Sequence, residues 1–378
     1  MPHERVLVNF FYAQPVGHAV EALHYCLGHH AADPEREIAV ALNADTAVGL
    51  AGYCPFVSAS YAIEHPFVDP GVDSRARLAH VPREWDWVLD DFRRWQDVQL
   101  ALFPGMRDYY AASDEHLVAR HGRSVVGAAR PGYLRHQRLR LALPAAAREA
   151  AAARMAEDGS WIAVMPAGSS ERALYPSVAS WRLILDALRT ALPGVRFALV
   201  GRLRRDRRSS TSLSAAEHAE LLAHEARPVD CFDVDLAEQL AVVEACDVFL
   251  APHTGFGLAA LAVGTPWLAL SGGRWFEYFF NRVPFRSIVP DTARYPCFSQ
   301  FDPVAVTDDD ADGPRTPSMS RARIRDELEA IAAAAVELTA GTLAYEDALA
   351  DYFAALLRAH HGDASAIWSI DGVHADYV

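Results

Sequence analysis

The chain has 378 residues, a formal net charge of -14 and a sequence pI near 5.6. This length exceeds the usual range of a single hydrophobic core, so it predicts two domains. The acidic balance disfavours a general nucleic-acid binder and a protein that lies on an anionic membrane surface, although it leaves room for a local basic site.

The first part of the chain alternates short apolar runs with helical patterns. Residues 6–13 form an apolar run that predicts a strand, and a Pro-Gly turn leads from it into a helix with an apolar face. Two further apolar runs, at residues 37–42 and 55–63, predict more strands of the same kind. The tryptophan-rich stretch from Glu84 to about Arg120 predicts helices that are interrupted at Pro104-Gly105.

The second part of the chain alternates strands and helices more strictly. Its strand patterns begin at Trp161 and continue at residues 194–201, 228–232, 247–252 and 265–270. Helical patterns of about 10 to 15 residues separate them, which is typical of βαβ units around a parallel sheet. The patterns that follow residue 318 are helical and have no further strand between them.

This order predicts an α/β protein with two doubly wound domains. We place the first domain at residues 1–155 and the second at residues 156–340. The helical segment 341–378 is expected to pack back across the junction toward the first domain.

Polar turns follow several strands of the second part, which is where parallel α/β sheets place their ligands. Gly168–Ser170 form an anion cradle after one strand, and Arg172 is available to neutralise charge there. His253–Gly257 form a second turn, in which Thr254 is placed to cap a helix and the glycines allow a phosphate to approach the backbone. Two such turns at one crevice suit a diphosphate, although a helix cap with packing glycines is an equally open interpretation of the second.

Other patterns in the second part give weaker evidence for a ligand site. The arginine run Arg202–Arg208 is typical of a solvated loop, with contact to an anion as the alternative. Neither a GxGxxG motif after a first strand nor a GxxxxGK[ST] motif occurs. Asp233 and Asp235 form a DxD pair, but Asp235 stands where a helix N-cap is expected. We therefore expect no metal and no resident cofactor.

The order of these motifs from Trp161 to about Asn281 resembles the nucleotide-binding half of the bacterial lipopolysaccharide heptosyltransferases, a GT-B glycosyltransferase family. The positions that correspond to the family's strand-turn-helix pattern are His253, Thr254, Gly255, Leu258, Ala259, Ala260, Gly264 and Pro266. The resemblance implies a GT-B fold, in which two Rossmann-like domains face a central cleft. It further implies a nucleotide-sugar in the second domain, an acceptor in the first, and metal-independent transfer with inversion.

The sequence also departs from the family pattern. The family's Asp before Thr-Gly is His253 here, its following His is Leu258, and Arg172 is nearest to the position of its lysine. The family's Gly-Asp pair at the start of the first helix, which carries the catalytic base, corresponds to Gly17-His18. Because imidazole accepts protons near neutral pH, His18 is the predicted base, and a capping or surface histidine is the alternative.

The predicted site residues fall into four groups. The predicted base is His18, and the acceptor cleft is predicted to include Gln14 and Gly17. The donor diphosphate or nucleotide is assigned to Gly168, Ser169, Ser170, Arg172, Gly201, Arg202, His253, Thr254, Gly255, Phe256 and Gly257. The donor sugar or diphosphate is assigned to Gly273, Arg274, Glu277 and Asn281.

We therefore expect a glycosyltransferase that moves a sugar from an ADP-, GDP- or UDP-linked donor to a hydroxyl of a small-molecule or glycan acceptor. Five scattered cysteines without a CxxC pair, no long apolar stretch and no signal layout predict a cytoplasmic protein with buried thiols and no stable membrane insertion. The lysine-free, alanine-rich composition is typical of a GC-rich actinomycete, which favours natural-product or cell-envelope glycan synthesis. A nucleotide-sugar epimerase of GT-B fold and a noncatalytic nucleotide-sugar-binding protein are the open alternatives.

Overall fold

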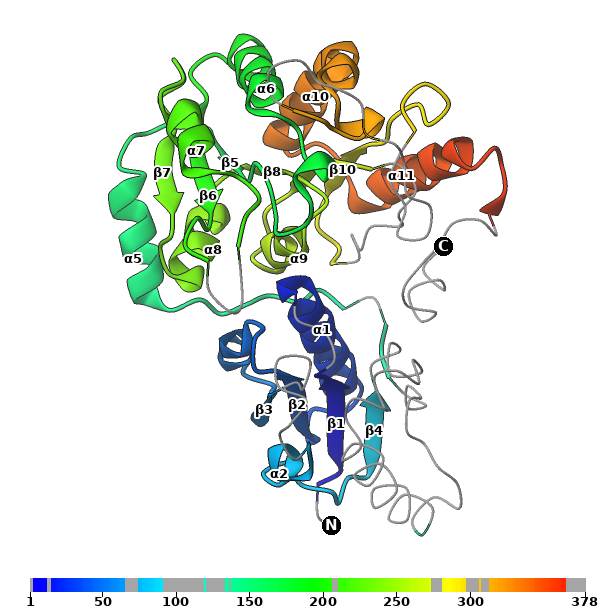
Figure 1. Cartoon of the computed structure of the whole chain (residues 1–378). Helices are drawn as coiled ribbons and strands as arrows, with labels where there is room; N and C mark the ends of the chain where they lie inside the picture. Colours follow the sequence, from blue (N-terminus) through cyan, green and yellow to red (C-terminus); the bar gives the residue numbers. More distant parts are fainter. Residues whose placement is uncertain are drawn as a thin grey trace. The chain divides into compact units, whose positions relative to one another are not determined.

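The chain divides into two compact units, Met1–Ala142 and Leu143–Val378, both drawn in Figure 1. The computed structural model describes residues 3–11, 15–64, 74–90, 119, 133–135, 137–205, 210–272, 281–296, 306 and 313–364. The finer division into residues 1–155, 156–340 and 341–378 stays a prediction.

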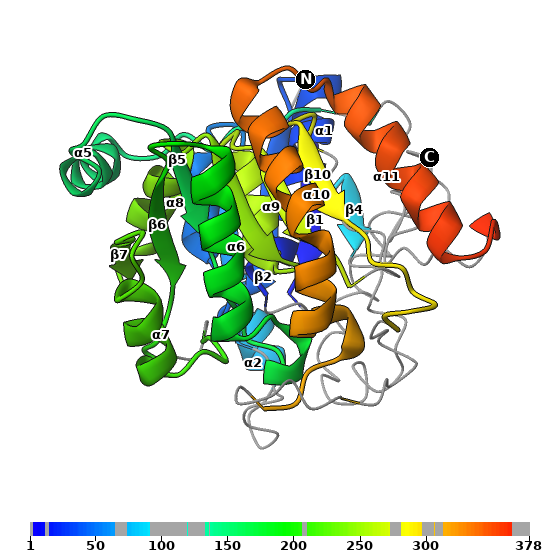
Figure 2. The same ribbon diagram turned by 90° about the horizontal axis from the view of Figure 1, so that it is seen from above.

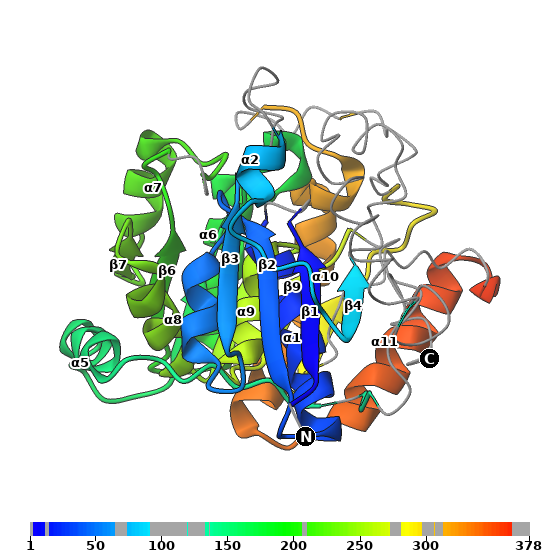
Figure 3. The same cartoon turned by 90° about the horizontal axis from the view of Figure 1, so that it is seen from below.

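The first unit contains a four-stranded parallel sheet (Figure 3). Its strands are β1 (Arg5–Phe10), β2 (Glu37–Asn43), β3 (Ala59–Ile63) and β4 (Trp87–Asp90), in the spatial order β3-β2-β1-β4. The long helix α1 (Val16–Ala32) packs against β1 and β2, with the shorter η1 (Val48–Tyr53) and α2 (Ser74–Leu78) in the connections. The three strands predicted from apolar runs are confirmed.

Strand β4 corrects the helix predicted at the start of the tryptophan-rich stretch. Trp87, Val88 and Leu89 are consecutive and all buried, and they pair in parallel with β1. A run that is buried on both faces suits a strand inside a covered parallel sheet better than an amphipathic helix. Residues 91–118 and Arg120 of that stretch lie outside the described residues.

The second unit contains a six-stranded parallel sheet. Its strands are β5 (Trp161–Val164), β6 (Arg196–Gly201), β7 (Val229–Phe232), β8 (Val248–Pro252), β9 (Trp267–Leu270) and β10 (Phe285–Ile288). Their spatial order is β10-β9-β8-β5-β6-β7. The five strands expected from the sequence are confirmed. The additional strand β10 was missed because only Phe285 of its four residues is fully buried, so it lacks an apolar run.

Helices cover both faces of this sheet, as a doubly wound fold requires. Figure 2 shows α6 (Val178–Ala191) side by side with α10 (Arg321–Ala340) in front of the strands, and the two helices are packed together. On the other face, α8 (Leu236–Glu244) and α9 (Gly255–Ala262) contact the strands, and α5 (Ala145–Arg154) packs on α8. The helix α7 (Ala215–Leu222) lies beside α6.

The last described helix, α11 (Tyr345–Ala359), packs against β10 of the second unit. The ring of Phe285 contacts the rings of Tyr345 and Tyr352. Arg286 bonds to Glu337 of α10 at 2.6 Å and to Asp351 of α11 at 2.6 Å. These contacts tie α11 to the second sheet, while the return of the C-terminal segment toward the first domain stays a prediction.

The four described cysteines are buried free thiols, as the sequence predicted. Burial raises the pKa of the Cys54 thiol to about 12 and that of Cys231 to about 11, because a thiolate is poorly solvated inside the protein. Among the helices in the described part of the chain, none is both long and apolar enough to cross a membrane.

Each sheet has a point at which the strand order reverses. In the second unit, the chain moves outward from β5 through β6 and β7, then returns to β8 beside β5 and continues outward through β9 and β10. The first unit repeats this arrangement, with β1 beside β4. Connections leave such a pair of strands in opposite directions, so a crevice opens outside their carboxyl ends, and ligands of doubly wound proteins bind there.

Candidate functional site

The turn after β5 is held by donors from neighbouring segments. Three successive carbonyls of the turn accept hydrogen bonds from α6 and from the segment that precedes α7. These bonds are Trp181 Nε1 to Pro166 O at 3.0 Å, Thr211 Oγ1 to Ala167 O at 3.1 Å, and Ser212 N to Gly168 O at 2.8 Å. The backbone of the turn is therefore fixed by the protein itself.

This turn lies beside the turn after β8. A Cβ atom on Gly168 would lie 3.3 Å from Cγ2 of Thr254 and 2.7 Å from the hydroxyl oxygen of Tyr175. The backbone N–H of Ser170 donates to that hydroxyl at 3.1 Å, and burial raises the pKa of the Tyr175 phenol. A side chain at position 168 would therefore collide with the Tyr175 hydroxyl and crowd the Thr254 methyl group, so a glycine is needed there.

Thr254 occupies the N-cap position of α9, and the helix begins at Gly255 as predicted. The side chain of Thr254 makes no cap hydrogen bond, and its hydroxyl instead lies 3.8 Å from the sulfur of Met165. The first turn of α9, from Gly255 onward, therefore has no side-chain acceptor from its N-cap residue. His253 is half-buried beside it. The positive end of α9 therefore lies just after the carboxyl end of β8.

Gly257 is required by packing. A Cβ atom at this position would lie 2.3 Å from the ring of Trp267, a fully buried residue of β9. The packing alternative for this glycine therefore accounts for it without a ligand, while Gly255 and Phe256 begin the helix.

Replacing Gly257 by alanine is expected to lower the free energy of unfolding by about 1–3 kcal/mol, because the added methyl group overpacks against the Trp267 ring. Urea-induced unfolding measures this change. Gly52→Ala is the matched control, since a Cβ atom there meets nothing within 4 Å. Equal midpoints for the two variants would contradict the packing role of Gly257.

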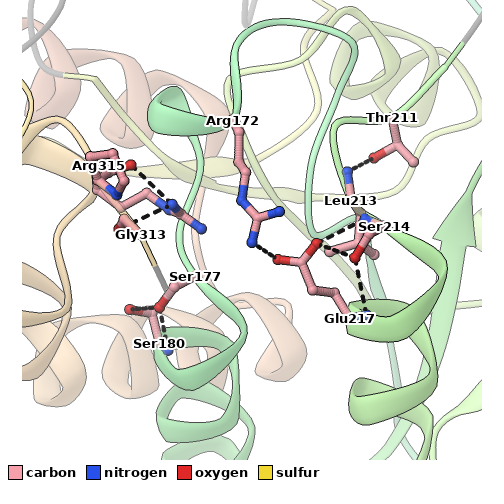
Figure 4. Close-up of polar contacts among 10 residues, drawn as sticks. Arg172, Ser177, Ser180, Thr211, Leu213, Ser214, Glu217, Gly313 and Arg315 are labelled. Atoms are coloured by element: carbon pink, nitrogen blue, oxygen red, sulfur yellow. Dashed lines mark hydrogen bonds and ion pairs between the residues drawn. The ribbon is translucent and has the colours of Figure 1, made fainter. Parts of the chain in front are cut away.

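Arg172 is held in place by a carboxylate (Figure 4). Its guanidinium donates to Glu217 of α7, and that carboxylate also accepts from the backbone N–H of Ser214 at 2.8 Å and from its hydroxyl at 2.6 Å. Ser214 Oγ in turn accepts from the backbone N–H of Glu217 at 3.3 Å, which completes a capping box. The side chain of Arg172 is still half exposed.

The turn after β6 is shaped by packing and by Asp233. Gly201 has a φ of +153°, and its carbonyl accepts from Gln239 Nε2 at 3.1 Å. Asp233 accepts from the backbone N–H of Arg204 at 2.9 Å, and Asp235 occupies the N-cap position of α8 as predicted, without a side-chain cap bond. Arg202 is half-buried, and Arg207 and Arg208 lie outside the described residues.

The segment after β9 is only partly described. Asn281 is buried, and its side-chain amide donates to the carbonyl of Leu261 at the end of α9 at 2.7 Å. The structure thus gives this amide a partner inside the fold, and its predicted contact with the donor stays a prediction. Gly273, Arg274 and Glu277 lie outside the described residues, and so does Gln14 of the predicted acceptor cleft.

In the first unit, His18 lies in the first turn of α1, directly after β1 at the strand reversal. Nδ1 of its ring lies 3.0 Å from a carboxylate oxygen of Glu21 one turn along the helix. The Glu21 side chain is 2% exposed and the His18 side chain 22% exposed. The hydroxyl of Thr46, which follows β2, donates to the carbonyl of Pro15, the N-cap residue of α1, at 3.4 Å. Gly17 in the first turn of α1 is buried.

Glu21 was missed in the sequence, although a signal was present. Residues three apart on a helix share one face, so the spacing of His18 and Glu21 allows the pair. No group of three or more His, Cys, Asp and Glu side chains that would suit a metal ion occurs within the residues that the structure describes. The metal-independent mechanism stays a prediction.

Comparison with solved structures places this arrangement among known folds. A glycosyl transferase family 9 protein from Veillonella parvula matches with a TM-score of 0.59 at 12% identity, over 90% of this chain and 99% of its own. The ADP-heptose LPS heptosyltransferase II of E. coli matches with a TM-score of 0.52 at 15% identity, over 87% of this chain and 98% of its own. No protein-family model and no curated protein sequence matches the chain. With its two parallel sheets and C-terminal helices, the chain has the GT-B fold of these glycosyltransferases.

Proposed function

We propose that this protein is a glycosyltransferase that moves a sugar from a nucleoside-diphosphate sugar to an acceptor hydroxyl, with inversion and without a metal. The observation that carries the proposal is the contact between the turns after β5 and β8 at the strand reversal of the second sheet. The name of the E. coli protein of the same fold, an ADP-heptose LPS heptosyltransferase, agrees with a nucleotide-sugar donor.

The donor diphosphate would bind at these two turns. The Gly168–Ser170 backbone lies against Thr254, and the positive end of α9 begins at the next residue. Arg172 supplies a full positive charge beside the first turn, and its bond to Glu217 leaves other guanidinium N–H groups for a phosphate. Arg202 follows β6, which pairs with β5, and we assign it to the nucleotide part of the donor.

His18 would act as the general base. The acceptor oxygen attacks the anomeric carbon of the donor sugar and forms the new C–O bond, while the bond from that carbon to the diphosphate oxygen breaks. The electron pair of the broken bond leaves on the diphosphate, and the acceptor proton moves to the His18 imidazole. Attack from the face opposite the leaving group inverts the anomeric centre.

The proposal also covers the donor nucleotide, the class of acceptor and the biological setting. An ADP-, GDP- or UDP-linked donor and a small-molecule or glycan acceptor fit it, within natural-product or cell-envelope glycan synthesis in the cytoplasm. The composition of the chain supports this setting. Such chemistry would use no metal or cofactor besides the donor.

Calorimetric titration with ADP-, GDP-, UDP- and dTDP-sugars tests the proposal directly. We expect the sugars linked to one of these nucleotides to bind at micromolar concentration. The free nucleoside diphosphate with the same base should also bind, because the diphosphate supplies the charge that the two turns recognise. If none of the nucleotides bound at that level, the proposal would fail. Conversion of the donor sugar without any acceptor would instead identify an epimerase.

Replacing Arg172 by glutamine is expected to weaken donor binding by about 10- to 100-fold, because a charge-assisted hydrogen bond to phosphate is lost. Calorimetry with the preferred donor measures the change. Arg182→Gln is the matched control, since Arg182 is another arginine of this unit and forms a similar surface pair with Glu220. A loss of the same size in both variants would mean that general surface charge, rather than Arg172, attracts the donor.

A further inference from the structure

We propose that Glu21 positions His18 as the general base, by accepting the Nδ1–H of its imidazole and so leaving the Nε2 lone pair for the acceptor proton. This inference rests on the proposed function for its catalytic meaning. The pairing of the two side chains is a separate statement that can be tested without any substrate.

The carboxylate of Glu21 is buried. The side chain of Glu21 is 2% exposed, although it lies only one turn from the start of α1. A carboxylate that is taken out of water is unfavourable unless hydrogen-bond donors surround it. The imidazole of His18 supplies such a donor at 3.0 Å.

The contact with Glu21 fixes the tautomer and orientation of the His18 ring. A neutral imidazole carries its proton on one nitrogen and accepts with the other, and the hydrogen bond made by the first fixes which is which. A carboxylate only accepts, so the oxygen of Glu21 at Nδ1 selects the Nδ1–H form. The lone pair is then on Nε2, and the ring is held in one orientation. Carboxylates that bond to the other ring nitrogen orient functional histidines in the same way in other proteins.

The two side chains of the pair differ in their exposure to solvent. The ring of His18 keeps 22% of its surface exposed, whereas Glu21 is enclosed. The pair follows β1, which lies beside β4 at the strand reversal of the first sheet. The buried member is thus inside the unit, and the partly accessible member is at the edge where ligands of such sheets bind.

The chemical consequence is a balanced proton transfer. When the acceptor oxygen bonds to the anomeric carbon, its proton passes to Nε2 of His18 and the imidazole becomes a cation. Both electrons of the broken C–O bond remain on the released nucleoside diphosphate. The carboxylate of Glu21 keeps its own charge throughout, and it stabilises the imidazolium through the same Nδ1–H bond. The proton later leaves Nε2 to solvent.

Nitrogen-15 NMR of the histidine side chains tests the pairing in the full-length protein without any substrate. At a pH where the ring is neutral, we expect His18 to show a protonated Nδ1 and an unprotonated Nε2, with the signal assigned by its loss in His18→Asn. In Glu21→Gln, the Nε2–H form should gain population, because an amide can also donate to Nδ1. Glu35→Gln is the matched control, since Glu35 stands near His3 on the surface of the same unit. A wild-type His18 with unprotonated Nδ1 would overturn the proposal.

Steady-state kinetics test the catalytic meaning. Glu21→Gln is expected to lower kcat by about 10- to 100-fold and to leave the donor Kd within about twofold of wild type, because Glu21 acts through His18 and not on the donor. In a His18→Ala background, the Glu21 substitution should cause no additional loss of kcat. Circular dichroism confirms that both variants fold. An unchanged kcat, or a Glu21 effect of equal size with and without His18, would overturn the positioning role.

Failure of the two proposals can be told apart. If no nucleotide binds to the wild-type protein, the proposed transferase function fails, whatever the NMR result. If the donor binds and sugar is transferred while Glu21→Gln keeps the wild-type tautomer and rate, only the positioning role fails.

Discussion

Replacing His18 by alanine is expected to lower kcat for sugar transfer by about 10²- to 10⁴-fold, the usual contribution of a positioned general base. The donor Kd should stay close to the wild-type value, because His18 belongs to the first unit while the two polar turns belong to the second. The acceptor hydroxyl would then have to lose its proton to water, which has no fixed position in the site. Single-turnover kinetics together with calorimetry separate the two quantities.

His30→Ala provides the control for this experiment. His30 lies near the end of the same helix, where its ring stacks on Phe56 at 5.7 Å, so its loss also removes a half-buried imidazole from α1. We expect it to transfer sugar at about the wild-type rate. Transfer by His18→Ala at that same rate, with donor affinity intact, would remove His18 as the base.

Replacing Trp181 by alanine is expected to lower the free energy of unfolding by about 3–5 kcal/mol, the usual effect of deleting a large buried aromatic side chain. Trp181 is fully buried in α6, and its indole N–H donates to the carbonyl of Pro166 under the turn after β5. Its loss removes both the packing and one of the bonds that hold the turn. Urea-induced unfolding measures the loss of stability. Calorimetric titration of the folded variant with the donor should show weaker binding.

A pair of conservative variants separates packing from the bond to the turn. Trp181→Phe keeps most of the apolar surface but leaves the Pro166 carbonyl without its indole donor. Trp85→Phe removes an equivalent bond in the first unit, where the indole of Trp85 donates to the carbonyl of Pro82 at 2.7 Å. We expect both to be destabilised, but only Trp181→Phe to bind the donor more weakly. Equal donor affinities would contradict a role of Trp181 in shaping the turn.

The elements with strong local signals could be predicted from the sequence. Parallel strands that are buried on both faces leave near-continuous apolar runs, and β1, β2 and β6 were found in this way. Strand β4 was assigned to a helix as part of the tryptophan-rich stretch from Glu84 to about Arg120, and its pairing with β1 outweighs that local pattern. The weak apolar content of β10 hid it, because the strand is held by pairing with β9 and by contacts of Phe285 and Arg286 with α10 and α11 rather than by an apolar run.

The candidate site was partly accessible to sequence reasoning. The turns after β5 and β8 were recognised by glycine and hydroxyl residues at strand ends, but their contact depends on β5 lying beside β8. That adjacency is a property of the sheet order and leaves no mark in either segment. The pairing of Arg172 with Glu217 and the burial of Glu21 were likewise hidden, because both depend on neighbours that the fold supplies. The missing side-chain cap bond at Thr254 has the same cause, since the Met165 sulfur near its hydroxyl comes from another strand end.

The three hydrogen-bonded carbonyls of the turn after β5 affect the entropy change of the protein when an anion binds there. Because Pro166, Ala167 and Gly168 already have donors from the protein, the conformational entropy of ordering this backbone is lost when the chain folds. An arriving anion does not cause that loss a second time, and it meets peptide dipoles whose orientation needs little rearrangement. Binding at this turn should therefore carry a small entropic penalty from the protein, and discrimination between donors is left to the residues around it.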